Sequence, residues 1–205
     1  VDLNAPQGKY DEADPLYKQA LAIRFKALGP DHPATIASEA GIANILQIKG
    51  DVAALPILRR VVDGLERARG ENHAEVAAAI NNLAVLLSNL GEYDEALKLR
   101  YRCLEIKKKT LGEEHPQFAA SLNNLANLLE LQGKYDESFE LRHRTLAIQK
   151  KALGEEHPQF ASSLSNLAEW LSNQVPTLVS AYPADEILRA STTKPSQCLS
   201  GRCGL

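Results

Sequence analysis

The feature that most constrains this chain is a pair of short motifs that recur in step. The first motif, Gly-x-Tyr-Asp-Glu, begins at Gly8, Gly91 and Gly133, with a degenerate copy at Gly50. The second motif, Leu-Gly-x-x-His-Pro, begins at Leu28, Leu111 and Leu153, with a weaker version at Arg69. Successive copies of either motif lie 41 or 42 residues apart. A fixed period of this length indicates a row of stacked supersecondary units.

Each unit contains two runs that are long enough for a helix. In the first run, Phe118, Leu122, Leu125 and Leu129 follow one another at steps of three and four, which gathers them on one helix face. Pro116 precedes them and is tolerated in a first turn, because its missing amide would have no partner there. The first run is therefore predicted to be an amphipathic helix.

The second run is predicted to begin with Asp136 as its N-cap and to end at Gly154, with Gly133 in the turn between the two helices. Small residues recur where neighbouring helices must approach closely. On the first helices these are Ala43, Ala84, Ala126 and Ala168, and on the second helices Ala13, Ala54, Ala96 and Ser138. One hairpin cannot bury both of its faces, so the copies must stack. We therefore expect an all-α fold, a right-handed α-solenoid of antiparallel helix hairpins.

These motifs resemble the tetratricopeptide repeat, and in particular the long repeat of kinesin light chains. The resemblance rests on Leu-Asn-Asn-Leu-Ala at 122–126, on Ile-Asn-Asn-Leu-Ala at 80–84, and on a second helix about two turns longer than in the usual repeat of about 34 residues. It covers residues 8–173. It implies that the first helices line a concave surface whose Asn residues hold an extended peptide.

We expect two regions, a solenoid over residues 1–174 and an irregular tail rich in Pro, Ser and Thr over residues 175–205. The solenoid should contain about eight helices, with half-repeats at both ends, and its last helix should end at Asn173 because Pro176 follows. The tail holds at most a short helix at Ala184–Ala190. Ordering costs roughly 1 to 2 kcal/mol per residue, so an ordered tail needs the last helix or another protein to lie on.

The candidate binding residues are side-chain amides on the first helices. They are Asn44, Asn81, Asn82, Asn123, Asn124, Asn127 and Asn166. An amide both donates and accepts hydrogen bonds, so it pairs with a peptide backbone without demanding particular side chains. The alternative is that some of these amides bridge neighbouring repeats, because buried polar groups need partners.

The charges on the two kinds of helix predict something about the ligand. The first helices offer mainly Ala and Ser, with Glu130 and Glu169, whereas Arg100 and Arg142 lie on second helices, where we expect a solvated outer face. An acidic peptide in the groove is therefore disfavoured. The net charge of -3 gives no basic excess, so we do not expect nucleic acid as a partner.

The histidines and cysteines are predicted to have structural roles and not to form a reaction centre. One His per repeat precedes a first helix, at His32, His73, His115 and His157. Equivalent atoms of adjacent repeats should lie about 10 Å apart, too far to share an ion at ligand distances of about 2 Å, so we expect polar helix starts. Cys103 is expected to be buried, whereas Cys198 and Cys203 could form a disulfide or stay free. With no nucleophile motif, we expect no enzyme, cofactor or metal.

The most direct functional reading is a non-catalytic scaffold that binds a protein or an extended peptide through its concave face or its ends. One alternative is a permanent structural subunit of a large assembly that holds the C-terminal tail. Another is a kinesin light chain-like cargo adaptor, which would need a coiled-coil segment, and no heptad pattern occurs here. No apolar run is long enough to cross a bilayer. The default compartment is the cytoplasm, and the lack of Met, even at position 1, favours a processed N-terminus and so allows an organelle.

Overall fold

The computed structural model describes residues 7–181, with side chains from 9 to 173. The chain divides into two units, residues 1–154 and 155–205. Every regular element of the described part is an α-helix, which confirms the predicted helical-repeat solenoid. The first unit contains α1 (Gln7–Leu28), α2 (Pro33–Ile48), α3 (Ala54–Arg69), α4 (Ala74–Asn89), α5 (Tyr93–Leu111), α6 (Pro116–Leu131) and α7 (Tyr135–Leu153), and the second contains α8 (Pro158–Ala181).

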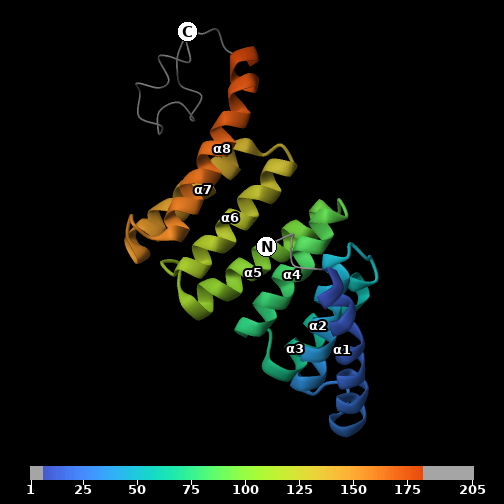
Figure 1. The fold of residues 1–205 in the computed structure, drawn as a ribbon. Coiled ribbons are helices and arrows are strands. Elements are labelled where there is room, and N and C mark those ends of the chain that lie inside the picture. Colours follow the sequence, from blue (N-terminus) through green and yellow to red (C-terminus); the bar gives the residue numbers. More distant parts are fainter. Residues whose placement is uncertain (1–6, 182–205) are drawn as a thin grey trace. The chain divides into compact units, whose positions relative to one another are not determined.

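The helices of the first unit pack in chain order. Each helix from α1 to α7 contacts the next one along the chain, as the sequence of colours in Figure 1 shows. Helices α2, α4 and α6 are the first helices of the three complete hairpins, and α3, α5 and α7 are their second helices. A junction between repeats is therefore the contact between a second helix and the first helix that follows it.

The four repeated histidines cap the helices that follow them. Their Nδ1 atoms accept the backbone N–H of the residue two positions on, at 3.2 Å for His32 and His73 and 3.1 Å for His115 and His157. Such a bond satisfies one of the amides left free in a first turn. The prediction that these residues are polar helix starts is confirmed.

The predicted N-cap of α7 is wrong by two residues. Lys134 is the cap residue, without a side-chain cap bond, and the helix begins at Tyr135. The Lys134 amide donates to the Leu129 carbonyl across the tight hairpin turn, at 2.9 Å, which places the helix start directly after it. Asp136 therefore lies inside the first turn, where its carboxylate interacts favourably with the helix dipole. Gly133 takes the predicted left-handed conformation, with φ 75°.

The small residues mark the closest helix contacts within the complete hairpins. Six of them are fully buried, with no exposed surface: Ala43, Ala84 and Ala126 on first helices, and Ala54, Ala96 and Ser138 on second helices. Ala13 is half-buried and Ala168 is exposed. Cys103 is buried as predicted, and its thiol donates to the Ala77 carbonyl at 3.4 Å. Its counterpart Thr145 donates to the Ala119 carbonyl at 3.2 Å, so both second helices lie against first-helix backbone.

Gly64 is buried in the middle of α3, where a glycine costs helix stability. A Cβ atom at this position would lie 2.9 Å from Cδ1 of Ile36 on α2. That distance is shorter than ordinary packing allows, so the glycine lets Ile36 approach the α3 backbone. The residue that weakens the helix therefore permits close packing of the α2–α3 hairpin.

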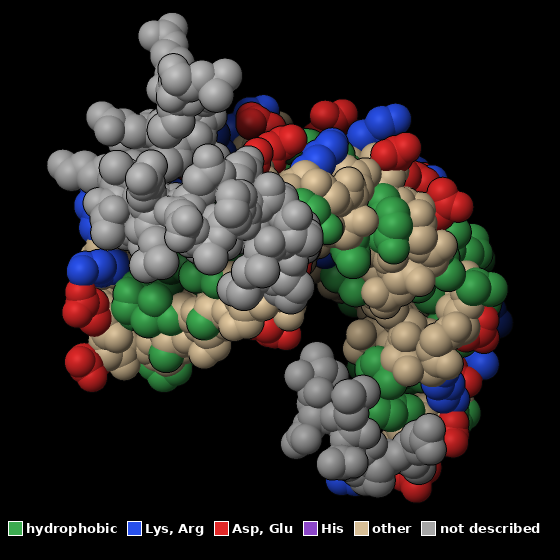
Figure 2. All heavy atoms as spheres, turned by 90° about the horizontal axis from the view of Figure 1, so that it is seen from above, with side chains coloured by type: hydrophobic (Ala, Val, Ile, Leu, Met, Phe, Trp, Pro, Cys, Tyr) green, Lys and Arg blue, Asp and Glu red, His purple; other side chains and the backbone are tan. Residues whose placement is uncertain are grey.

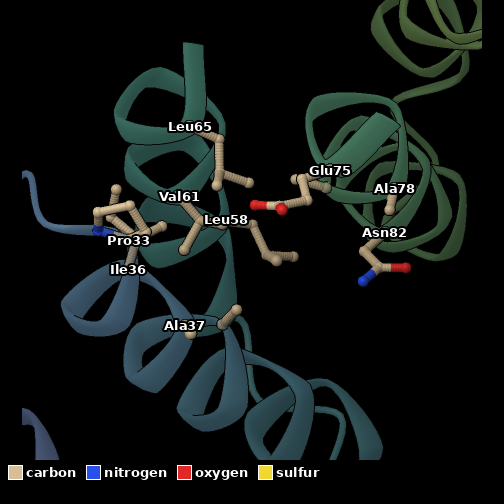
Figure 3. A pocket seen from close by; sticks show the side chains of 11 residues that line it. Pro33, Ile36, Ala37, Leu58, Val61, Leu65, Glu75, Ala78 and Asn82 are labelled. Carbon is tan, nitrogen blue, oxygen red and sulfur yellow. The ribbon is translucent and has the colours of Figure 1, made fainter. Parts of the chain in front are cut away.

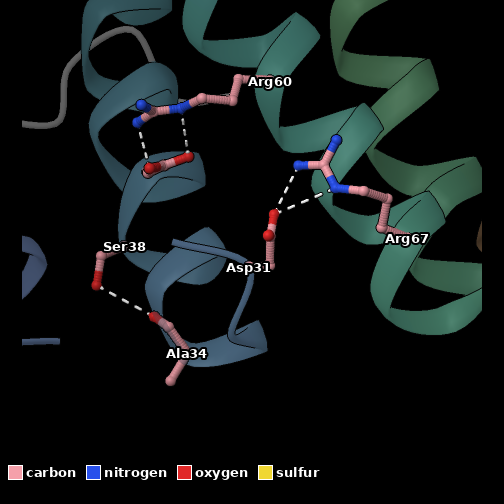
Figure 4. Close-up of polar contacts among 6 residues, drawn as sticks. Asp31, Ala34, Ser38, Arg60 and Arg67 are labelled. Carbon is pink, nitrogen blue, oxygen red and sulfur yellow. Dashed lines mark hydrogen bonds and ion pairs between the residues drawn. The ribbon is translucent and has the colours of Figure 1, made fainter. Parts of the chain in front are cut away.

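Ion pairs join α2 and the loop before it to α3 (Figure 4). Arg67 pairs with Asp31 at 2.6 Å on the surface, where such a pair contributes little stability. Arg60 forms two hydrogen bonds with the buried carboxylate of Glu39. Burial raises the pKa of Glu39, and Arg60 opposes that rise. Glu39 is thus a buried acid that its partner only partly compensates.

The last helix extends further than the sequence predicted. Helix α8 runs through Pro176 to Ala181, past the expected end at Asn173. A proline removes one backbone hydrogen bond, which here does not end the helix. The predicted short helix at Ala184–Ala190 and the two tail cysteines lie outside the described residues. No helix in residues 7–181 combines the length and the hydropathy needed to span a membrane.

Candidate functional site: the first-helix face and the repeat junctions

The outward sides of α2, α4 and α6 form one candidate surface, which we call the first-helix face. Its exposed residues include small and amidic ones, which are Ala37 and Asn44 on α2, Ala78 and Asn82 on α4, and Ala120 and Asn127 on α6, together with Glu75 on α4 and the apolar Ile48 and Leu131 at the ends of α2 and α6. Ala37, Ala78 and Ala120 lie one repeat apart and take equivalent positions. The amides do not repeat in this way, because the counterpart of Asn82 on α2 is Gly41 and that of Asn44 on α4 is Val85. Small side chains leave the helix backbones close to whatever lies on this face.

The predicted Asn residues fall into two groups. Asn44 and Asn82 are exposed, and Asn123 is half-buried on α6. The other three residues of the first unit bridge helices: Asn81, Asn124 and Asn127 make the contacts described below. Asn166 is half-buried on α8, which belongs to the second unit.

Asn81 lies at the centre of a polar cluster between α4, α5 and α6. Its Oδ1 accepts from Arg100 Nη1 at 2.5 Å and from Asn124 Nδ2 at 3.3 Å. One repeat further on, Asn127 Oδ1 accepts from Arg142 Nη2 at 2.9 Å. These three amides therefore bridge helices, as the alternative prediction stated. Each amide has four hydrogen-bonding positions, so it keeps capacity for a ligand.

The prediction that Arg100 and Arg142 lie on a solvated outer face is wrong. Arg100 is 7% exposed and Arg142 is 5% exposed. Arg100 follows Ala96 by four residues and precedes Cys103 by three, so all three residues share the buried face of α5. That spacing could have revealed the burial. The sequence-based argument against an acidic ligand therefore fails at the α5–α6 junction.

The two buried arginines differ in whether a carboxylate balances their positive charge. Arg142 pairs with the Glu130 carboxylate at 2.6 Å as well as with Asn127. The residue that corresponds to Glu130 one repeat earlier is Ser88, whose hydroxyl donates to its own helix at Ala84. Among the described residues no carboxylate pairs with Arg100, and burial lowers its pKa. Arg100 is thus a buried cation held by a neutral amide.

An open pocket of ≈ 230 Å³ lies where α2, α3 and α4 meet. We call it the α3–α4 pocket. Figure 3 shows Leu58, Val61 and Leu65 of α3 on one wall, with the Glu75 carboxylate pointing toward them from α4. The remaining lining residues are Pro33, Ile36, Ala37, Ala40, Ala78, Ala79 and Asn82. The walls are largely apolar, and Glu75 and Asn82 supply the polar groups of the lining.

At the α1–α2 junction, larger side chains fill the equivalent place. Leu58 corresponds to Tyr17, and Asn82 corresponds to Gly41. A Cβ atom on Gly41 would overlap the Tyr17 ring, so the ring lies directly against this glycine. Arg24 completes the junction, because its Nη1 donates to Ser38 Oγ at 2.6 Å.

At the α5–α6 junction the equivalent place is polar. Leu58 corresponds to Arg100, which reaches Asn81, the counterpart of Ala40. Leu65 corresponds to Lys107, whose Nζ donates to Ser121 Oγ at 2.7 Å, and Ser121 is the counterpart of Ala79. The α3–α4 pocket was not predicted from the sequence, although an alignment of the repeats at these positions shows where small and apolar residues replace polar ones.

Among the described residues that are visible in Figure 2, acidic and basic side chains lie intermixed, without a broad area of one sign. Within the described part of the chain, His, Cys, Asp and Glu form no group of three or more that could hold a metal ion.

Family models and solved structures match this helical arrangement. Two tetratricopeptide repeat models match, one over residues 2–54 and 117–174 and the other over residues 76–117. No curated protein matches. Two crystal structures of a candidate kinesin light chain of Podosopora anserina, with nearly identical TPR-like repeats, are each 30% identical to this chain. The structure of a singly substituted form has a TM-score of 0.72 and covers 90% of this chain and 89% of its own. The other has a TM-score of 0.71 and covers 91% and 90%.

A third structure supports the fold alone. BtubC (BKLC) from P. vanneervenii is 22% identical, with a TM-score of 0.71, and covers 90% of this chain and 74% of its own. The family models, the 42-residue step between α4 and α6 and the stacked hairpins agree with one another. This chain belongs to the tetratricopeptide repeat family, in its kinesin light chain-like long form.

Proposed function

We propose that this chain is a non-catalytic scaffold that binds an extended peptide or protein segment on its first-helix face. Tetratricopeptide repeats are protein-interaction modules. The proposal adds which face of this chain binds the partner and which side chains make the contact. The observation that carries it is the composition of the face. Exposed amides of Asn44 and Asn82 lie beside the exposed small residues Ala37, Ala78 and Ala120.

Small residues and amides suit a peptide backbone for two different reasons. The alanines let a ligand come close to the helices, which increases the apolar surface removed from water. The amides supply donors and acceptors for the peptide N–H and C=O groups, which lose water when they are buried. Asn82 on α4 and Asn124 on α6 occupy equivalent positions, with Asn124 also donating to Asn81, whereas the position on α2 is Gly41.

A displayed random-peptide library, selected on the immobilised chain, tests this proposal. Peptides recovered from it should bind the chain saturably when synthesised. The double variant N44A/N82A should bind them about tenfold more weakly, because it removes two exposed hydrogen-bonding groups. N72A is the matched control, since Asn72 is an exposed amide in the loop before α4, off the face. Failure to recover any binding peptide, or equal affinity in both variants, would contradict the proposal.

The kinesin light chain-like structures favour a second, narrower function, that of an adaptor which links a cargo protein to a larger machine. This function uses the same face and adds a second, permanent contact. The structural-subunit alternative predicts such a permanent contact as well. Measuring the size of the native protein in material from its source separates the scaffold from the permanently bound adaptor or subunit. A scaffold with exchangeable ligands should be recovered partly as the free chain, and a permanent subunit should not.

A further inference from the structure

We propose that this chain associates head to tail, with α8 of one copy packed against α1 of a second copy to form a composite helix hairpin. In the order of the repeat, α1 takes the place of a second helix and α8 takes the place of a first helix. The contact is heterologous, because each copy contributes a different surface to it. The proposal does not depend on peptide binding to the first-helix face.

Both helices expose apolar side chains at positions that the complete hairpins bury. Ile23 on α1 is 61% exposed, whereas its counterparts Ile106 and Ile148 are buried. Leu171 on α8 is 44% exposed, whereas its counterpart Leu129 is buried. Steps of three and four place further residues on the same helix sides. We call Ala13, Leu16, Ala20 and Ile23 the α1 stripe, and Ala161, Leu164, Ala168 and Leu171 the α8 stripe. Terminal repeats of a soluble solenoid need a polar outer face, so these two apolar stripes favour a further layer of helix.

The two stripes match each other in size. Ile36 on α2 lies against Gly64 on α3, so one large residue meets one small residue. At the equivalent positions the other two hairpins carry an alanine on the first helix and an isoleucine on the second, namely Ala77 with Ile106 and Ala119 with Ile148. Ala161 on α8 and Ile23 on α1 repeat that combination. A composite hairpin therefore packs a large side chain against a small one, as close-packed helices require.

The two helices also match in charge beside the stripes. In each complete hairpin, a cation near the end of the second helix bonds a polar residue in the loop before the first helix. The pairs are Arg67 with Asp31 at 2.6 Å, Lys109 with Asn72 at 3.4 Å, and Lys151 with Glu114 at 2.5 Å. The equivalent residues are Lys26 on α1 and Glu156 before α8, and both are exposed. A second copy therefore supplies the opposite charge at the position where the complete hairpins form this contact.

The composite contact buries no unpaired charge. The complete hairpins bury two carboxylate–guanidinium pairs, formed by Arg60 with Glu39 and by Arg142 with Glu130. On α8 the counterparts of the two acids are Leu164 and Ser172, and on α1 the counterparts of the two arginines are Gln19 and Tyr17. Both members of each pair are thus replaced by uncharged residues, which avoids the cost of an isolated buried ion.

Sedimentation equilibrium of the whole chain tests the proposal. The average mass should rise with concentration, with a dissociation constant on the order of 10–100 µM, because one helix pair is smaller than the interfaces of stable complexes. I23E and L164E should each keep the mass of one chain, because each places a charge on one stripe. F25E and S162E are the matched controls. They change exposed residues on other sides of the same two helices and should associate like the parent.

Mixing the two blocked variants tests the direction of the contact. I23E keeps an intact α8 stripe and L164E keeps an intact α1 stripe, so an equimolar mixture should form a species of two chains. Charge exchange is a second test that leaves the stripes unchanged. K26E should weaken association about threefold, and K26E/E156K should restore it. If a blocked variant does not fold in thermal unfolding experiments, the charge exchange decides.

Several results would overturn the proposal. A parent chain that keeps the mass of one chain up to about 0.5 mM, well above the expected constant, would exclude the contact. Association by I23E alone would place it between two α8 helices, and association by L164E alone would place it between two α1 helices. A mixture of the blocked variants without a two-chain species, or a charge exchange without recovery, would contradict the head-to-tail arrangement.

Discussion

The α3–α4 and α5–α6 junctions share a helix arrangement and differ in what fills it. At α3–α4, Leu58, Ala40 and Ala79 leave an open apolar pocket. At α5–α6, the counterparts of these residues and of Leu65 form two hydrogen-bonded pairs, Arg100 with Asn81 and Lys107 with Ser121. The residues of each junction are matched to one another, since a buried arginine needs the amide that holds it. The repeat therefore tolerates either an apolar or a polar junction, provided that all the residues of that junction change together.

The largest expected effect comes from mixing the two chemistries. L58R alone places a cation against Ala40, which has no acceptor, and leaves Glu75 as the one carboxylate of the pocket lining that can pair with it. We expect the free energy of unfolding to fall by about 2 kcal/mol. Adding A40N should recover about 1 kcal/mol through the amide that Arg100 uses. Urea unfolding of the two single variants and the double variant measures this coupling. If L58R is as stable as the parent, the junctions are not matched in the way described.

The two buried arginines should respond in opposite directions. R142L strands Glu130 and should cost about 2 kcal/mol, because it breaks a partly buried pair. R100L removes a buried cation that lacks a carboxylate partner, so it should be neutral or stabilising by about 1 kcal/mol. Chemical denaturation of both variants at pH 7 is the measurement. Equal losses would show that Arg100 is compensated after all.

Gly64 tests the packing next to the pocket. G64A gains about 1 kcal/mol of helix propensity but must displace the flexible end of Ile36, so its net effect should be close to zero. In an I36V background, which lacks that terminal carbon, the same change should stabilise by about 0.5–1 kcal/mol. A loss of similar size in both backgrounds would mean that Ile36 is not the constraint.

The smallest effect concerns pH. Burial raises the pKa of Glu39 above its ordinary value of 4.5, so its contribution to stability is present below pH 4.5 and is lost as the pH rises through the folded pKa. E39Q should therefore gain a few tenths of a kcal/mol relative to the parent between pH 4 and 7. The hydrogen bond from Lys108 lowers the pKa of Glu113, so E113Q should show the opposite trend. Parallel trends in the two variants would contradict this account.

The sequence predicted the architecture well because its signals are local and repeated. Helix periodicity, the His caps and the small residues of the complete hairpins each depend on a few neighbouring positions, and all agree with the structure. The prediction of Asp136 as the N-cap of α7 is wrong, because the hairpin turn fixes where that helix begins. The burial of Arg100 and the α3–α4 pocket depend on contacts between three helices, which no single repeat contains.

A crystal of the chain derivatised with xenon tests the central claim, that one junction is an apolar vacancy and its neighbour is filled with polar side chains. Xenon enters apolar cavities of this size. The account predicts a xenon site among Leu58, Val61 and Leu65, and none beside Arg100. Xenon at both junctions, or at Arg100 alone, would contradict it.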